Sequence, residues 1–201
     1  MKKRETIDAY DVYYEVYDAE TMDFWEEFPR SMILEFQRCI KGKNILDLGS
    51  GPGRDAEILR SFGMEVTCVD ASKNMAKTTE DRGFKTIVAD IREINFDLWD
   101  FDGVWAYSSL IHITFEEAKK VIFNLSNGLK SNAILFLGLI GGKDSEIKNI
   151  GGSGYKRYFE LYDDEKVMRL MEGTGFDLIS VKRFQPKNHV YLNYLFRLRG
   201  K

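Results

Sequence analysis

The sequence is poor in the residues that mark several common classes of protein. It contains two cysteines, two histidines and three prolines in 201 residues. Cys39 and Cys68 have no C-x-x-C or metal-ligand spacing, so we expect two reduced packing residues rather than a disulfide or a metal site. The formal charge of −3 gives no excess of basic residues, which argues against nucleic acid or an anionic membrane as a partner.

Long hydrophobic stretches are also missing. The longest apolar run, residues 133–140, has the length of a strand and is too short to cross a membrane. The first four residues are basic, but no apolar segment typical of a signal peptide follows them. We therefore expect a cytoplasmic protein with no membrane partner and no metal.

The remaining composition is that of an ordinary globular domain. Apolar residues make up 44% and charged residues 30% of the chain, and its length suffices for one core. Residues 1–42 are rich in aromatic side chains and predict a helical cap. Residues 43–201 alternate between short strands and helices and predict an α/β core. We expect a single domain that is a monomer or a homodimer.

The alternation after residue 42 predicts a parallel sheet with right-handed crossovers. The expected strands are 45–48, 65–69, 85–89, 102–106 and 133–140, and the expected helices are 54–62, 72–82, 115–129 and 163–172. Thr114 and Glu117 form a capping-box pattern before the third of these helices. The last two expected strands, 176–184 and 190–198, are too close in sequence for a crossover and must form an antiparallel hairpin. Residues 138–154 predict a glycine-rich loop.

The most informative stretch is N-I-L-D-L-G-S-G-P-G-R-D, which starts at Asn44. A short apolar run ends in a carboxylate, Asp47, and a helix-compatible segment begins near Arg54. The glycines that alternate between them are Gly49, Gly51 and Gly53. Glycine allows the backbone to touch a ligand, and a strand, loop and helix in this order bind nucleotides in open α/β sheets. A dinucleotide fingerprint would need a third glycine or alanine where Arg54 stands, so the spacing favours an adenosine-bearing ligand without a pyrophosphate.

Polar residues end the following three expected strands. Asp70 ends the second strand, where a carboxylate can accept hydrogen bonds from both ribose hydroxyls. Asp90 ends the third strand, where a carboxylate can accept a hydrogen bond from an adenine amino group. The fourth strand leads into a polar cluster of Tyr107, Ser108, Ser109 and His112. One acid at a strand end is often only a turn or a helix cap, but three beside a glycine loop indicate a binding site.

These motifs resemble those of the class I S-adenosylmethionine-dependent methyltransferases over about residues 8–198. D-L-G-S-G-P-G-R-D looks like their cofactor loop, Asp70 like their ribose-binding acid, and Asp90-Ile91 like their adenine-binding pair. The resemblance implies S-adenosyl-L-methionine as cofactor. It also implies a Rossmann-like, doubly wound α/β sheet of seven strands in the order 3-2-1-4-5-7-6, with the last strand antiparallel and an N-terminal helical lid. The cofactor-binding residues that it implies are Asp47, Gly49, Ser50, Gly51, Gly53, Asp70, Ala71, Asp90, Ile91, Tyr107 and Tyr10.

Within this class, G-R-D-A, W-A-Y-S-S-L-I-H-I and Y-F-E-L-Y-D-D-E-K look most like small bacterial methyltransferases of the tellurite-resistance type. That subgroup often carries an acidic, glycine-containing stretch, whereas residues 141–154 are both basic and acidic, so the acceptor cannot be carried over. The [DN]-P-P-[YF] motif of enzymes that methylate base nitrogens is absent, and A-Y-S-S stands in its place. We therefore expect a small-molecule acceptor.

Several residues are candidates for work on the acceptor. His112 is the natural group to take a proton from a hydroxyl or ammonium. Its alternative role is to hydrogen-bond the backbone or to line the methyl site, and an anionic acceptor would need no base. Tyr10 is expected in the lid, or else packed on the core. Arg157, Tyr158 and Tyr162 are candidates to contact an anionic or aromatic acceptor, or else form a structural edge.

Two other functions stay open at this point. A protein that binds S-adenosylmethionine or S-adenosylhomocysteine without transferring a methyl group would carry the same motifs. An NAD-dependent oxidoreductase is the third candidate, and both Arg54 and the terminal hairpin argue against it.

Overall fold

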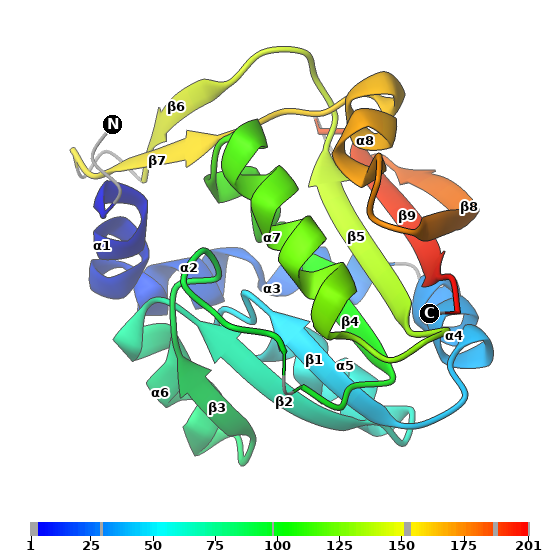
Figure 1. Ribbon diagram of the computed structural model, residues 1–201. Helices are drawn as coiled ribbons and strands as arrows, with labels where there is room; N and C mark the ends of the chain where they lie inside the picture. The colour runs from blue at the N-terminus through cyan, green and yellow to red at the C-terminus, as the bar shows by residue number, and fades with distance from the viewer. Residues whose placement is uncertain (1–3, 29, 98, 151–153, 187–188, 201) are drawn as a thin grey trace.

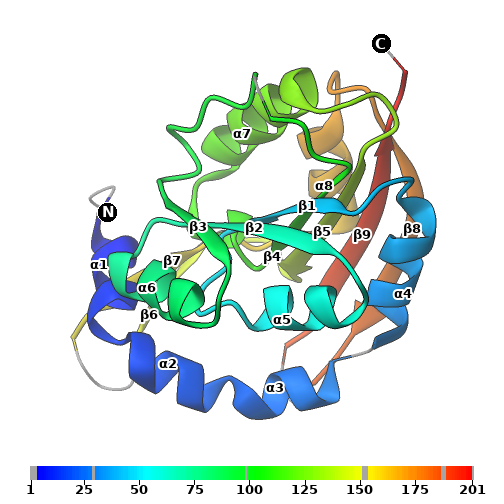
Figure 2. The same ribbon diagram turned by 90° about the horizontal axis from the view of Figure 1, so that it is seen from below.

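The computed structural model is built on one seven-stranded mixed sheet with helices on both faces (Figures 1 and 2). It describes residues 4–28, 30–97, 99–150, 154–186 and 189–200. The strand order is β3-β2-β1-β4-β5-β9-β8. β9 runs antiparallel to both β5 and β8, and the other neighbours are parallel. Because β8 and β9 are the sixth and seventh of the expected strands, the predicted Rossmann-like topology is confirmed.

The strands of this sheet follow the short apolar runs of the sequence. They are β1 (Asn44–Leu48), β2 (Glu65–Asp70), β3 (Lys85–Val88), β4 (Gly103–Tyr107), β5 (Ile134–Ile140), β8 (Phe176–Phe184) and β9 (Tyr191–Leu198). Every residue of β4 and β5 is buried, as expected for central strands that are covered on both faces. The first four strands are parallel, so their carboxyl ends meet at one edge of the sheet.

The helices include three that begin at a side-chain cap, which Ser72, Thr114 and Asp163 provide. The helices are α1 (Glu5–Val12), α2 (Tyr14–Glu20), α3 (Met22–Glu27), α4 (Arg30–Cys39), α5 (Arg54–Ser61), α6 (Lys73–Asp81), α7 (Phe115–Gly128) and α8 (Asp164–Met171), with a short 3-10 turn, η1 (Leu110–His112). The predicted capping box of Thr114 and Glu117 starts α7. The sequence predicts that Pro29 starts or breaks a helix, and this residue lies outside the described residues. None of the described helices has both the length and the apolar character that a membrane span requires.

Two cores hold the layers together. α7 and α8 lie on one face of the sheet, and α4 and α5 lie on the other (Figure 2). Along β9, Leu192 and Tyr194 belong to the first core, whereas Leu195 belongs to the second. Trp105 is fully buried in the second core and stacks on Phe136 with 3.7 Å between ring centroids. β9 is therefore covered on both faces, whereas most of β8 is exposed at the edge of the sheet.

The segment expected as one glycine-rich loop, residues 138–154, contains regular structure instead. Its first residues end β5, and β6 (Glu146–Asn149) pairs antiparallel with β7 (Lys156–Phe159) as a separate two-stranded sheet. The prediction was wrong here because charged residues interrupt both strands and hide the usual apolar run. Gly151, Gly152 and Ser153 lie outside the described residues. β7 lies beside α1 (Figure 1), where the Tyr158 amide donates to Thr6 Oγ1 at 3.0 Å.

Candidate active site

The glycine loop leaves β1 in a conformation that only glycine adopts without strain. Gly49, Gly51 and Gly53 have φ values of +77°, +54° and +85°. A Cβ on Gly49 would lie 2.3 Å from the Cβ of Ser109, whereas a Cβ on Gly51 would meet nothing within 4 Å. Gly49 is therefore required by packing. Gly51 keeps a space open above the loop, as a backbone that approaches a ligand must.

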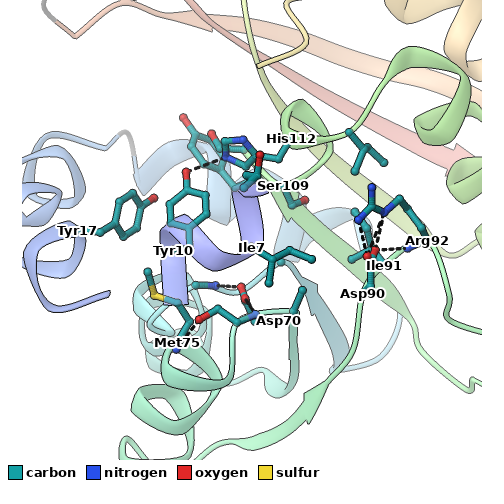
Figure 3. Close-up of a pocket in the computed structure, with 18 residues that line it drawn as sticks. Ile7, Tyr10, Tyr17, Asp70, Met75, Asp90, Ile91, Arg92, Ser109 and His112 are labelled. Atoms are coloured by element: carbon teal, nitrogen blue, oxygen red, sulfur yellow. Dashed lines mark hydrogen bonds and ion pairs between the residues drawn. The ribbon is translucent and has the colours of Figure 1, made fainter. Parts of the chain in front are cut away.

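A cavity lies above this loop, at the carboxyl edge of the sheet. α1 and α2 cover it, and the last residues of β2 and β4 and the segments that follow β1 and β3 supply its floor (Figure 3). Its lining residues are Thr6, Ile7, Tyr10, Tyr17, Gly49, Gly51, Asp70, Ala71, Ser72, Met75, Asp90, Ile91, Arg92, Tyr107, Ser108, Ser109, His112 and Ile113. Segments far apart in sequence thus share one concave site.

Asp70 is fixed at the centre of the cavity floor. Its Oδ2 accepts a hydrogen bond from the Gly51 amide at 2.8 Å, and its Oδ1 accepts one from the Ser72 amide at 2.8 Å. Burial raises the pKa of Asp70 to about 6, although these amides oppose the shift. The carboxylate is therefore oriented by backbone donors and is sensitive to mild acid.

Asp90 lies at the far end of the cavity and is paired within its own turn. Arg92 donates to it from Nε at 2.8 Å, and the Arg92 amide donates to Oδ1 at 3.0 Å (Figure 3). Arg92 also reaches Glu117 with Nη1 at 3.3 Å. The sequence analysis did not identify Arg92, although its position two residues after the acid was a usable signal. The ion pair compensates the charge of Asp90, so a ligand meets a neutral pair at this end.

The other end of the cavity is lined by aromatic rings around His112. The Tyr10 hydroxyl lies 2.8 Å from His112 Nε2 (Figure 3). His112 Nδ1 lies 2.8 Å from the Tyr158 carbonyl. A carbonyl can only accept, so Nδ1 carries the hydrogen and Nε2 accepts from Tyr10. Burial, together with the charge of Arg157, lowers the pKa of His112 to about 4, against the opposing effect of the hydrogen bond to the Tyr158 carbonyl. His112 is therefore neutral with both ring nitrogens engaged.

Arg157 stands behind Tyr10. Its Nη1 donates to the Tyr10 hydroxyl at 3.3 Å, and its guanidinium carbon lies 5.4 Å from the centroid of the Tyr10 ring. Arg157 Nε is buried and has no hydrogen-bond partner. Within the described part of the chain, no Asp or Glu forms an ion pair with Arg157. This end of the site therefore carries a positive charge without a counter-charge.

Two buried acids lie beneath the glycine loop. Asp47 is 2% exposed, and its Oδ2 has no hydrogen-bond partner. Burial, with Asp55 and Asp70 nearby, raises the pKa of Asp47 well above its usual range. Asp55 accepts a hydrogen bond from the Trp105 indole at 2.6 Å, and burial raises its pKa to about 7. The unsatisfied oxygen of Asp47 fits a ligand that brings a cationic donor to this loop.

Two acids of the N-terminal helices fasten them over the cavity. Asp11 Oδ1 accepts from Ser72 Oγ at 2.8 Å and from the Asn74 amide at 2.9 Å, at the start of α6. Asp18 pairs with Arg54 at 2.6 Å and with Arg82 at 2.9 Å. The sequence analysis missed both acids, because a single carboxylate on an amphipathic helix looks like a solvated surface residue. Arg54, read there only as a departure from a dinucleotide motif, has a structural role.

The structure brings together most of the residues singled out from the sequence. Lining the cavity are Tyr10, Gly49, Gly51, Asp70, Ala71, Asp90, Ile91, Tyr107 and His112. Asp47 lies in β1, Ser50 and Gly53 lie in the loop, and none of the three belongs to the lining. Tyr158 contributes its carbonyl, while its hydroxyl donates to Glu160. The Tyr162 ring is fully buried in the core and faces no part of the cavity lining. Ile7, Tyr17 and Met75 also line the cavity, and periodicity alone could not separate them from packing residues.

Comparison with known proteins places this site in a family context. Residues 46–137 match the family described as methyltransferase domain. The Methanocaldococcus jannaschii protein MJ1123 is 29% identical over 175 residues, which cover 85% of this chain and 82% of the relative. The DhpI–S-adenosylhomocysteine complex superposes with a TM-score of 0.79 at 16% identity and covers 98% of this chain and 97% of that one. A second similar structure is the 1,6-didemethyltoxoflavin-N1-methyltransferase of Burkholderia thailandensis with 1,6-didemethyltoxoflavin and S-adenosylhomocysteine bound. It superposes with a TM-score of 0.72 at 17% identity and covers 97% of this chain and 88% of that one.

The family match begins in β1 and ends in β5, so it contains the glycine loop and the strand ends that form the cavity floor. The structural matches extend the likeness of fold to the N-terminal helices and the terminal hairpin. Residues 46–137 are therefore similar to a methyltransferase domain, and the chain as a whole has the Rossmann-like fold of these solved structures.

Proposed function

We propose that the protein transfers a methyl group from S-adenosylmethionine to a small-molecule acceptor. The observation that carries this proposal is the cavity itself. An open glycine, two strand-end acids and an aromatic pocket line a single concave site in the order that an extended adenosyl ligand requires. The family match and the S-adenosylhomocysteine held by two similar structures support the same cofactor.

The residues of the site suit the parts of this cofactor. Asp70, oriented by two amides, would accept the ribose hydroxyls, and Asp90 with Ile91 would hold the adenine. Gly49 and Gly51 would allow the methionyl chain to cross the loop. Asp47, with its unsatisfied oxygen, would receive the ammonium group. Ser50 and Gly53 would shape the loop, and Ala71 would line the ribose pocket.

The aromatic end would then face the reactive sulfonium, which supplies an electrophilic methyl group when the cofactor is bound. Tyr10, Tyr17, Tyr107 and His112 line this end. Their rings would exclude water and confine an acceptor beside the methyl group, and positioning is the main requirement of an in-line displacement. We assign His112 the orienting role, because both of its ring nitrogens are already engaged. Tyr158 and Tyr162 would shape the acceptor side from behind, without direct contact.

A small acceptor suits the size of this enclosed end, and the similar Burkholderia structure holds 1,6-didemethyltoxoflavin. The absence of a basic surface excess supports a small molecule over nucleic acid. The closer likeness to methyltransferases of the tellurite-resistance type rests on the motifs around Arg54 and His112 and identifies no acceptor. A protein that binds the cofactor without transfer is the alternative function.

Two measurements separate these possibilities. Calorimetric titration with S-adenosylmethionine, S-adenosylhomocysteine and NAD tests the ligand, and we expect the first two to bind and NAD not to bind. A panel of small acceptors, assayed for release of S-adenosylhomocysteine, then tests transfer. Binding of NAD alone would overturn the proposal. Cofactor binding with no turnover across acids, phenols, thiols and amines would favour the non-catalytic alternative.

A further inference from the structure

The methyl end of the cavity lacks a group that can take a proton. His112 Nδ1 donates to a carbonyl and Nε2 accepts from Tyr10, so its basic nitrogen is occupied. Asp70 accepts two amide hydrogen bonds, and Asp90 is paired with Arg92. The remaining ionisable groups of the lining, Tyr10, Tyr17 and Tyr107, are phenols whose pKa values burial raises. An acceptor that must lose a proton during transfer would find no free base among the described residues that line the cavity.

The positive charge of Arg157 at this end also favours an acceptor that is already ionised. Arg157 reaches the Tyr10 hydroxyl, and its buried Nε has no partner. A guanidinium in a partly buried position favours an oxyanion, because charge-assisted hydrogen bonds are about twice as strong as neutral ones. Arg157 is not itself among the lining residues, but its Nη1 lies 3.3 Å from the hydroxyl of Tyr10, which is, so its positive charge lies one side chain away from the cavity. An ammonium ion would meet like charge here, and a neutral amine would have to be formed first.

We infer that the acceptor is a small acid whose nucleophilic oxygen or sulfur is already ionised at neutral pH, and that Arg157 selects it as the counter-charge of the methyl end. This inference rests on the proposed function. In the transfer, a lone pair of the anion forms the new bond to the methyl carbon, and the carbon–sulfur bond breaks with its electron pair remaining on sulfur. The products are a neutral methyl ester or thioether and neutral sulfide, so no proton moves and no further reactant is needed.

The test uses the full chain loaded with S-adenosylhomocysteine and three probes of equal shape, benzoate, benzamide and benzylamine. Titration calorimetry at neutral pH should show benzoate binding about tenfold more tightly than either other probe, as expected for one charge-assisted contact. In Arg157→Gln this preference should disappear, and in Arg157→Lys, which keeps the charge, part of it should remain. Circular dichroism and the affinity for S-adenosylhomocysteine serve as controls of folding.

Each outcome decides the matter. Equal binding of benzoate and benzamide, or a preference for benzylamine, would overturn the inference. So would an Arg157→Gln variant that binds benzoate normally. A third result would also overturn it: the variant stays folded, its affinity for S-adenosylhomocysteine falls tenfold or more, and its affinity for 5′-methylthioadenosine, which lacks the amino-acid tail, is unchanged. Arg157 would then bind the carboxylate of the cofactor and not the acceptor. A parent protein that does not bind S-adenosylhomocysteine would instead defeat the proposed function.

Discussion

Tyr10 and His112 lie 102 positions apart in the chain and share a hydrogen bond of 2.8 Å between the phenol oxygen and Nε2. The bond joins α1 to the turn after β4. Because Nδ1 donates to the Tyr158 carbonyl, the same imidazole also connects β7. One half-buried ring thus links the N-terminal cap, the sheet edge and the β6–β7 hairpin around the cavity.

Removing the Tyr10 hydroxyl should loosen this connection. In Tyr10→Phe, α1 loses one hydrogen bond to the core, worth about 1 kcal/mol. We expect faster amide exchange along α1, with exchange in β1, β4 and β5 unchanged. Tyr14→Phe is the matched control, since the Tyr14 hydroxyl donates to the adjacent Glu15 at the surface. Equal exchange in both variants would mean that apolar packing alone holds α1.

Asp11 should hold the same helix from the opposite side. Its carboxylate accepts from Ser72 Oγ and from the Asn74 amide, and Ser72 in turn donates to Asp70. In Asp11→Ala we expect S-adenosylhomocysteine to dissociate faster by about tenfold, the equivalent of one charged hydrogen bond. Stopped-flow displacement measures this rate. Asp8→Ala, at an exposed position of α1, is the control, and S-adenosylhomocysteine should dissociate from it at the same rate as from the parent.

The pKa of Asp70 sets a pH dependence for cofactor binding. Burial raises this pKa to about 6, and the ribose-binding role needs the ionised form. Below this pH the acid must first lose a proton, so the affinity for S-adenosylhomocysteine should fall by about tenfold per pH unit and should be flat above it. Asp70→Asn should bind about ten- to a hundredfold more weakly, with no such slope. A slope that persists in the variant would assign the titration to another acid, such as Asp47.

Two glycines of the loop should respond differently to alanine. At Gly51 a Cβ meets no protein atom, so Gly51→Ala should stay folded, at a cost of about 1–2 kcal/mol for its positive φ. Its methyl group would occupy cavity space and weaken cofactor binding. In Gly49→Ala the Cβ would lie 2.3 Å from the Ser109 side chain, so stability itself should drop further. Thermal denaturation combined with titration calorimetry separates the two effects, and normal cofactor affinity in Gly51→Ala would place the ligand elsewhere.

Much of this arrangement could be predicted from the sequence. Apolar runs, a capping box and a five-residue hairpin connection are local signals, and they predicted the strands, the helices and the terminal hairpin. The strand order came from the resemblance to a known family, and the strand-end acids followed because their positions are fixed by the strands. The partners of those acids could not be predicted. That Arg92 pairs with Asp90, or that Asp18 holds Arg54 and Arg82, depends on side-chain directions in the folded chain.

The role of His112 shows the same limit. Its position after β4 marked it as a base, yet basicity depends on burial and on what the two ring nitrogens contact. Both contacts come from segments remote in sequence, namely α1 and β7. The β6–β7 hairpin itself was hidden because its strands carry alternating charge rather than an apolar pattern, so the carbonyl that orients His112 had no local signature.

The pH dependence of turnover tests that role directly. With its pKa lowered to about 4 by burial, His112 stays neutral through the range in which an ordinary histidine, with a pKa of about 6.5, titrates. Once an acceptor is found, the rate at saturating cofactor should not rise between about pH 5.5 and 7.5. The side-chain amide of Gln can accept from Tyr10 and donate to the Tyr158 carbonyl, so the turnover rate of His112→Gln should stay within a few-fold of that of the parent. His112→Ala breaks both hydrogen bonds, and its turnover rate should fall further. A general base would instead cost about 10²–10⁴ in either variant and would give the parent a rise near pH 6.5. That pattern would return proton transfer to His112 and would exclude an acceptor that arrives ionised.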